Sequence, residues 1–465
     1  MPCSSSSSPT IISKCTIYPD QNSDTKSLKL SVSDIPMLSC QYIQKGVLLS
    51  YPPYSFDDLI TFLQNSLSSA LSFFPALAGR LSTDSDGHIH ILCNDAGIDF
   101  VQAKAKHISL LNILSPDLDV PYCFKEFFAF DKLLSYNGHF KPLVAVQVTE
   151  LSDAVFIGCT VNHSVTDGTS FWHFFNTVAE ICKGDTSTNK KISNLPDFSR
   201  NTVFNSPAVL KFPSGGPKVT FSGDEPLRER IFHFSRDAIL KMKYKANNGN
   251  LLERKGKQNN DSWKIVNGES NGGVLKNKTD EISSFQSLCA QLWRCVTRAR
   301  KLPLTKTTTF RMAVNCRHRL EPRLHPYYFG NAIQSIPTIA PIGELLSRDL
   351  HWGADLLHKN VVAHDDNTVR KGIADWEREP RLFPLGNFDG ASITMGSSPR
   401  FPMYNNDFGW GRPLAIRSGR ANKFDGKISA FPGKEGNGSV DLEVVLSPET
   451  MARIEQDEEF MQYVS

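Results

Sequence analysis

Hydrophobic side chains recur at helical spacing in three parts of the chain. Over 56–74 they fall four residues apart on one face of a predicted helix, at Leu59, Leu63, Leu67 and Leu71. Ser55 precedes this stretch and can cap its free backbone amides, and Pro75 ends it. The same periodicity predicts further helices over 169–183 and 284–300.

Short apolar runs predict strands between these helices. We expect strands over 11–18, 28–32, 144–150, 154–161, 310–315 and 441–446. A turn of only three residues, Leu-Ser-Asp, joins the third run to the fourth, which predicts an antiparallel hairpin. Because strands and helices mix in both halves without a fixed repeat, the pattern predicts an α/β or α+β fold.

Two polar stretches divide the chain. Its 465 residues suit two domains of about 200 residues each. The segment 184–218 is rich in Asn, Ser, Thr, Pro and Lys, which indicates a crossover linker between domains covering 1–200 and 201–465. A second polar stretch, 246–280, predicts a mobile surface insertion.

Composition and charge narrow the functional classes. The chain is 40% hydrophobic and 21% charged with a net charge of +3, which is typical of a soluble protein and too mild for nucleic-acid binding. No run approaches the roughly 20 apolar residues of a membrane helix, so we expect no membrane insertion. The start, MPCSSSSSPT, lacks the features of a secretory signal, and the ten cysteines include no CxxC pair. Together they predict reduced thiols and a cytoplasmic location.

The sequence HSVTDG at 163–168 directly follows the strand predicted over 154–161. Histidine is the side chain best suited to accept a proton near neutral pH. A thioester is already activated, so an attacking hydroxyl mainly needs its proton removed, and a positioned base contributes about 10²–10⁴-fold to such a step. His163 is therefore a candidate general base. The alternative is a histidine whose hydrogen bonds are satisfied at a strand end, because the motif alone is weak.

Two neighbours of His163 also carry expectations. Asp167 can act on the imidazole or brace the loop, and spacing alone does not separate these roles. Gly168 is expected to allow a positive φ where the loop turns into the helix.

A second motif, DFGWG, occupies 407–411 and is followed by Arg412 and Pro413. Two glycines around a tryptophan disfavour both a helix and a central strand. By itself this segment predicts a tight turn capped by an aromatic side chain.

HSVTDG and DFGWG, in this order and about 240 residues apart, resemble the motifs of the BAHD acyltransferases, plant enzymes that acylate metabolites from acyl-CoA. Other segments are similar to the family's as well: FPALAGRL at 74–81, LWRC at 292–295, NCRHRL at 315–320, YFGN at 328–331 and DEEF at 457–460. The resemblance thus covers nearly the whole chain.

The resemblance implies two chloramphenicol-acetyltransferase-like domains, each a mixed sheet with flanking helices, and an active-site channel between them. Acyl-CoA and a small-molecule acceptor would enter from opposite faces of a monomer and meet at His163, the general base. Acyl-CoA would be a co-substrate, and no cofactor would be bound permanently.

The resemblance also implies roles for other residues. Asp167 would point away from the substrate and pair with an arginine, for which Arg317 is the candidate. Asp407, Gly409 and Trp410 would shape the channel or its CoA side without taking part in the chemistry.

One position departs from the family pattern. Many relatives have a tryptophan nine residues before the DFGWG aspartate, close to the thioester oxygen, and this chain has Ser398 there. Losing an oxyanion donor costs about 10²–10³-fold in rate. Ser398, Ser397 or a backbone amide is a possible replacement donor, and a wider site that admits a bulky acceptor is the alternative.

A metal site is not predicted. His88 and His90 share one face of a strand, but the preceding 84–87 segment, DSDG, is typical of an ordinary turn and no further ligand cluster is evident. Basic residues at 298–301 and in 246–280 are candidates for CoA phosphates, and solvated basic faces explain them equally well.

The function predicted from the sequence is acyl-CoA-dependent O-acyl transfer to a hydroxyl of a plant specialised metabolite, with acetyl-CoA as the favoured donor. Transfer to an amine is one alternative. A lyase-type reaction that uses the same pocket without CoA is another, and a non-catalytic binding protein is disfavoured because His163 and Asp167 are both retained.

Overall fold

The structure is a computed structural model. The structure describes residues 8–115, 118–184, 191–200, 204–213, 215–221, 225–249 and 281–465. Of the expected insertion 246–280, residues 246–248 form the end of a helix and 250–280 lie outside the described residues.

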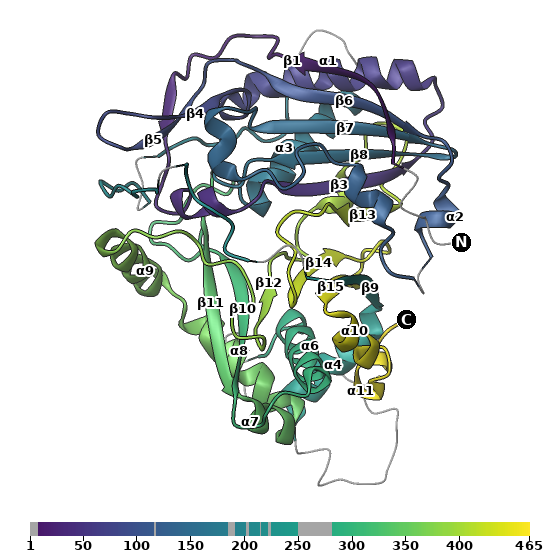
Figure 1. Ribbon diagram of the computed structural model, residues 1–465, viewed down its shortest axis with the longest axis vertical. Helices are drawn as coiled ribbons and strands as arrows, with labels where there is room; N and C mark the ends of the chain where they lie inside the picture. The colour runs from purple at the N-terminus through teal and green to yellow at the C-terminus, as the bar shows by residue number, and fades with distance from the viewer. Residues whose placement is uncertain are drawn as a thin grey trace, which may run out of the picture.

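Six described strands form the first sheet, which is drawn mainly in purple and blue in Figure 1. In spatial order they are β1 (Thr10–Ile17), β6 (Ile98–Ala105), β7 (Val144–Leu151), β8 (Ala154–Val161), β3 (Ile43–Ser50) and β13 (Ala415–Ser418). Strands β6 and β7 are parallel and the other neighbours are antiparallel. The predicted hairpin is the pair β7 and β8, both of which are buried throughout.

The second sheet also contains six described strands. Its order is β11 (Ile333–Pro341), β10 (Thr307–Asn315), β12 (Ile393–Met395), β14 (Lys427–Pro432), β15 (Val440–Leu446) and β9 (Arg228–Phe234). The short strand β12 pairs in parallel with both β10 and β14. A small separate sheet consists of β2 (Ser27–Lys29), β5 (Ile89–Leu92) and β4 (Arg80–Thr83).

Helices cover each large sheet. On the first, α1 (Phe56–Phe73) and α3 (Gly168–Lys183) contribute their apolar faces to one core. On the second, α4 (Arg236–Asn248), α6 (Ser284–Arg300) and α8 (Leu350–Ala363) pack together over a separate core. The remaining described α-helices are α2 (Leu110–Ile113), α7 (Ile342–Ser347), α9 (Asp366–Arg378), α10 (Pro448–Ile454) and α11 (Glu458–Met461).

Local chemistry explains why the long helices begin and end where they do. The Ser55 hydroxyl accepts the Asp58 amide at the start of α1, and all four leucines of the sequence pattern are buried. Helix α6 begins with a capping box between Ser283 and Gln286. The predicted two-domain α/β architecture with mixed sheets and flanking helices is confirmed.

The chain crosses between the two halves late in the sequence. After leaving the second sheet at β12, it adds β13 to the edge of the first sheet and then returns to the second at β14. Figure 1 shows this yellow strand beside the purple β3.

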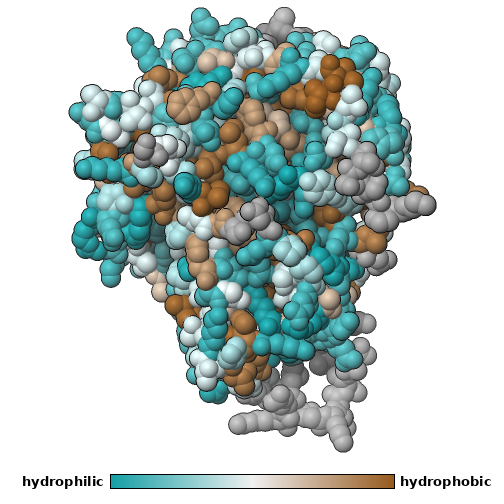
Figure 2. Space-filling model, viewed as in Figure 1, coloured by the Kyte–Doolittle hydropathy of each residue, from teal (hydrophilic) through white to brown (hydrophobic). Residues whose placement is uncertain are grey.

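The space-filling view of the same face is mostly hydrophilic with scattered hydrophobic clusters (Figure 2). Among the described residues, no helix combines the length and hydrophobicity needed to span a membrane.

Candidate active site

His163 lies in the short turn that joins β8 to α3. The Asn162 side chain accepts hydrogen bonds from the amide and the hydroxyl of Ser164, at 2.9 and 2.7 Å, which closes the turn on itself. The His163 amide donates to the Ser135 hydroxyl at 3.0 Å, and the Asn331 side chain donates to the His163 carbonyl at 2.8 Å. The backbone of the histidine is therefore held from three sides.

The imidazole Nδ1 lies 3.2 Å from the Thr166 carbonyl, in hydrogen-bond contact. A carbonyl only accepts, so this bond requires the proton on Nδ1 and leaves a lone pair on Nε2. No described residue forms a hydrogen bond with Nε2. Burial lowers the pKa of His163 below its usual value of 6.5, and the positive charge of Lys427 lowers it further. The neutral imidazole is thus the form present at pH 7.

His163 lies in the wall of a cavity of about 1330 Å³ between the two halves of the protein. Residues of β3 and α3 line it from the first half, and residues of β10, β11, β12 and β14 line it from the second. Ligand pockets typically measure about 300–1,000 Å³. The cavity therefore has room for an acyl group and an acceptor at the same time.

Asp167 is the N-cap of α3 and forms an ion pair with Arg317, just past the end of β10. The two side chains are completely buried, with a bidentate contact of 2.6 and 3.1 Å. Asp167 also accepts the amides of Ser170 and Ala332, at 2.9 and 3.1 Å. The imidazole contacts the Thr166 carbonyl, and no hydrogen bond links the ring to Asp167. This geometry favours a role for Asp167 in bracing the turn over a direct role in orienting or charging the imidazole.

Gly168 is required for a reason other than the one expected. Its φ is not positive, so that prediction is wrong: the residue is the first of α3 and has ordinary helical backbone. A Cβ at this position would lie 2.6 Å from the ring of Phe401, a residue of the segment that precedes DFGWG. Gly168 therefore allows close approach of the two motif regions.

The DFGWG loop is fastened to the first sheet and its helix. Asp407 accepts the amides of Gly409 and Gly411, whose φ values of 111° and 127° favour glycine, and pairs with Lys183 at the end of α3. The Trp410 indole donates to the carbonyl at the end of β3, from Ser50, at 3.0 Å. None of the residues 407–411 is in the described wall of the cavity.

Ser397 and Ser398 both line the cavity with His163. The Ser398 Oγ accepts the Arg400 amide at 3.3 Å, which leaves its own proton free to donate. Lys427, at the start of β14, lines the same cavity, and its Nζ lies against Gly396, where an added Cβ would be only 2.0 Å from it. Sequence reasoning missed Lys427 and its neighbour Lys45 because neither belongs to a motif or a periodic pattern.

The other candidate residues have partners of their own. Arg298 pairs with Asp457 and Glu459, and Arg300 pairs with Asp425, so these two cations are engaged within the fold. Lys301 is exposed at the end of α6, and the candidates at 250–280 lie outside the described residues.

His88 and His90, at the turn over 84–87, have contacts that stabilise the turn itself. Asp84, Asp86 and His88 bring potential ligand atoms within 4.8 Å of one another on the surface. The Asp84 carboxylate already accepts the amides of Asp86 and His88 and contacts the ring of His90 at 3.0 Å. These contacts are typical of a turn that opens a strand.

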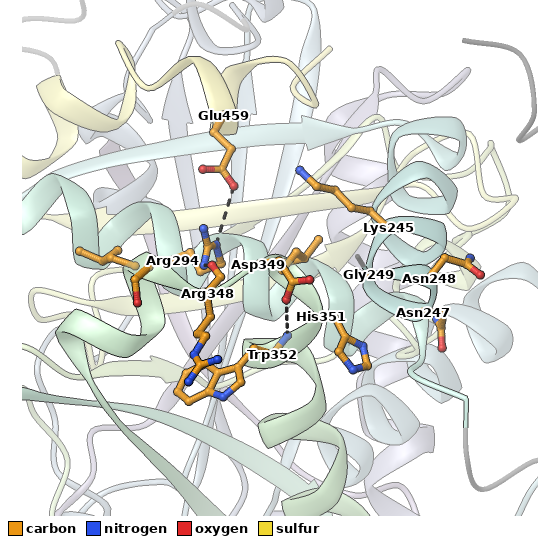
Figure 3. A pocket seen from close by; sticks show the side chains of 13 residues that line it. Lys245, Asn247, Asn248, Gly249, Arg294, Arg348, Asp349, His351, Trp352 and Glu459 are labelled. Carbon is orange, nitrogen blue, oxygen red and sulfur yellow. Dashed lines mark hydrogen bonds and ion pairs between the residues drawn. The ribbon is translucent and has the colours of Figure 1, made fainter. Parts of the chain in front are cut away.

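A second hollow, of about 790 Å³, lies between α4, α6 and the start of α8. Figure 3 shows that Arg294 faces Glu459, 3.8 Å away, and that Asp349 accepts the amide of Trp352. HSVTDG and DFGWG contribute no residue to the described wall of this hollow, whereas LWRC and DEEF contribute Arg294 and Glu459.

Comparisons with known proteins agree with this arrangement. The chain is 31% identical to the BAHD acyltransferase DCR of Arabidopsis thaliana over 94% of this chain and 88% of that protein. It is 30% identical to an uncharacterized acetyltransferase of the same plant over 94% of each. Its fold superposes on TRI101 of F. graminearum, solved with coenzyme A and deoxynivalenol, with a TM-score of 0.73 at 16% identity, covering 95% of this chain and 99% of that one.

Two domains, each built on a mixed sheet with flanking helices, share one cavity and have the fold of TRI101. The family model described as "Transferase family" matches residues 8–461. The chain belongs to the BAHD family and is an acyl-CoA-dependent acyltransferase.

Proposed function

We propose that this enzyme transfers an acyl group from acyl-CoA to a hydroxyl of a plant specialised metabolite, with His163 as the general base. The observation that carries the proposal is the imidazole in the cavity wall, whose Nδ1 contact with the Thr166 carbonyl leaves Nε2 free to accept a proton. The lowered pKa of His163 keeps that nitrogen unprotonated at neutral pH.

The proposed reaction has two steps. Nε2 takes the proton of the acceptor hydroxyl as the oxygen attacks the thioester carbonyl, which forms the C–O bond. The tetrahedral intermediate then collapses, the C–S bond breaks, and the proton passes from His163 to the CoA thiolate. The products are an ester and free CoA, and no oxidant or reductant is needed.

Other residues have supporting roles in the proposal. Asp167 and Arg317 fix the turn that carries His163, and the loop of Asp407, Gly409 and Trp410 fastens the segment at Phe401 against α3. The Ser398 hydroxyl is the proposed oxyanion donor, because it lines the same cavity with its proton free.

An acetyl donor is favoured in this proposal because one relative is named an acetyltransferase.

We further propose that the enzyme is a monomer and acts in the cytoplasm. No disulfide joins any of the nine described cysteines, which suits a reducing compartment. Light scattering on the purified protein tests the oligomeric state.

A screen of donors against acceptors tests the proposed function. Acetyl-, malonyl- and hydroxycinnamoyl-CoA are each incubated with alcohols and amines, and free thiol is measured together with the acylated product. Thiol release with alcohols is the expected result. Acylation of amines only would instead support N-acyl transfer. Conversion of an acceptor in the absence of CoA, with no thiol released from any donor, would overturn the proposal in favour of a lyase.

A further inference from the structure

The cavity that contains His163 is strongly basic. Asp375 is the one acidic residue in its described wall, whereas eight lysines and arginines contribute to it. Two of these, Lys45 on β3 and Lys427 on β14, lie deep between the sheets and are half-buried. Burying an ammonium group is unfavourable unless it is paired, so both positions are costly without a partner for the charge.

In the described part of the chain neither lysine forms a close ion pair, and the charge of Glu443 acts on both without a direct contact. The Lys45 Nζ lies over the ring of Phe431, 4.7 Å from its centroid, and the Lys427 Nζ lies 6.0 Å from the centroid of Phe424. No hydrogen bond or ion pair from a described residue reaches either ammonium group. Ring faces attract cations, but they leave all three N–H donors of each lysine free.

The nearby acidic residues are engaged elsewhere. Glu229 forms its ion pair with Lys423, and Glu443 lies 3.4 Å from the same lysine. Glu443 also accepts the Ser418 hydroxyl at 2.6 Å, and Glu229 lies 3.6 Å from Lys125. With Lys45 and Lys427, four lysines therefore surround two glutamates, which leaves a surplus of positive charge at the cavity wall.

Burial is the main cause that lowers the pKa of each lysine to about 8, and the charge of Glu443 opposes this effect in both. The charges of Lys423 and Lys427 lower the pKa of Lys45 further. Both groups are still mostly protonated at pH 7. A bound anion would favour the protonated form of both, since charges attract strongly in a poorly solvated site.

The location of the charges limits which anion can bind. Lys45 and Lys427 line the same cavity as His163, and the Lys427 charge lowers the pKa of His163. The phosphates of CoA are separated from the thioester by the length of the pantetheine arm. A carboxylate on the acyl group or on the acceptor matches two ammonium groups without close ion pairs in the cavity that also contains the base.

We propose that Lys45 and Lys427 together bind a carboxylate of a substrate, so that the enzyme acts on an anionic donor or acceptor in preference to its neutral analogue. This inference rests on the proposed acyl transfer and names the class of substrate for it. Neither residue belongs to the sequence motifs, and the role is separate from that of His163.

Matched pairs of substrates test the inference with the full chain. On the donor side, malonyl-CoA is compared with acetyl-CoA. On the acceptor side, hydroxy acids such as 3-hydroxybenzoate are compared with their methyl esters. We expect the wild type to prefer the carboxylate in one of these two arms by about ten- to a hundredfold in kcat/KM, as a charge-assisted hydrogen bond provides. The arm that shows the preference identifies which substrate carries the carboxylate.

Single substitutions show which lysines cause the preference for the carboxylate. Lys45→Met and Lys427→Met should each reduce this preference, measured as the ratio of kcat/KM for the carboxylate to that for its neutral analogue, about tenfold or more. The matched control is Lys371→Met, which removes an exposed positive charge from the wall of the same cavity and should keep the preference. An equal loss for charged and neutral substrates would overturn the inference, because it would indicate that Lys427 stabilises the oxyanion.

A binding measurement separates failure of the site from failure of the proposed reaction. Acetic anhydride modifies accessible lysines, and mass spectrometry quantifies modification at each one. We expect 3-hydroxybenzoate or malonate to protect Lys45 and Lys427 but not Lys371, and the methyl ester to protect none. Protection without any thiol release would uphold the site and contradict acyl transfer. Thiol release with no carboxylate preference and no protection would uphold acyl transfer and overturn the site.

Discussion

Asp167 and Arg317, 150 residues apart in the sequence, form a completely buried ion pair that joins the start of α3 to the end of β10. Arg317 also donates to the carbonyls of Tyr328 and Gly330, at 3.0 Å each. These contacts fix the turn that carries His163 to both halves of the protein.

Asp167→Asn should reduce the free energy of unfolding by roughly 3–5 kcal/mol, because it leaves the Arg317 charge buried without its counter-ion. Urea denaturation monitored by circular dichroism measures this loss. Asp355→Asn is the matched control, since it breaks an exposed ion pair with Lys359 on α8 that is worth about 0.3–0.5 kcal/mol. A variant at Asp167 that lost rate but kept its stability would contradict the bracing role.

The pH dependence of kcat/KM should report the environment of His163. Because the folded protein lowers its pKa, the imidazole remains neutral as the pH falls to 6.5, and activity should decline only below that value. Lys427→Met removes a positive charge that lowers this pKa, so the acid limb should move to higher pH. Initial rates between pH 5 and 8 measure both effects. An acid limb above pH 6.5 in the wild type would show that another group controls the rate.

Gly168→Ala should lower stability by about 1–3 kcal/mol and reduce activity, because the new methyl group would displace the Phe401 ring against which α3 begins. Gly184→Ala, at the other end of α3, is the control. Its Cβ would meet nothing closer than 3.4 Å and its φ is −68°, so we expect a much smaller change. Thermal unfolding compares the two variants, and equal shifts in Tm would contradict the role given to Phe401.

The regular elements follow from the sequence where the pattern is strong. The expected strand 154–161 and helix 284–300 agree with β8 and α6 to the residue, because burial on one or both faces leaves a clear periodicity. The strand expected over 28–32 is shorter, Ser27–Lys29, since the Val32 amide leaves the ladder to bond the Phe204 carbonyl. A contact with a residue so distant in the chain leaves no local signal.

The site is predictable only in part for the same reason. The apolar run over 154–161 predicts where the strand ends, and HSVTDG therefore places His163 just past that end. The approach of Phe401 to Gly168 and the return of β13 to the first sheet depend on tertiary packing. Lys45 and Lys427 become a pair only when β3 and β14 face one cavity, so neither is remarkable in the sequence itself.

The most direct test of the central claim is free CoA release by the wild type and by His163→Ala, measured with the same donor and acceptor. We expect the wild type to release CoA in step with ester formation. The variant should lose about 10²–10⁴-fold in rate while its circular dichroism spectrum and Tm are unchanged. A folded His163→Ala variant that releases CoA and forms the ester at the wild-type rate would contradict the account.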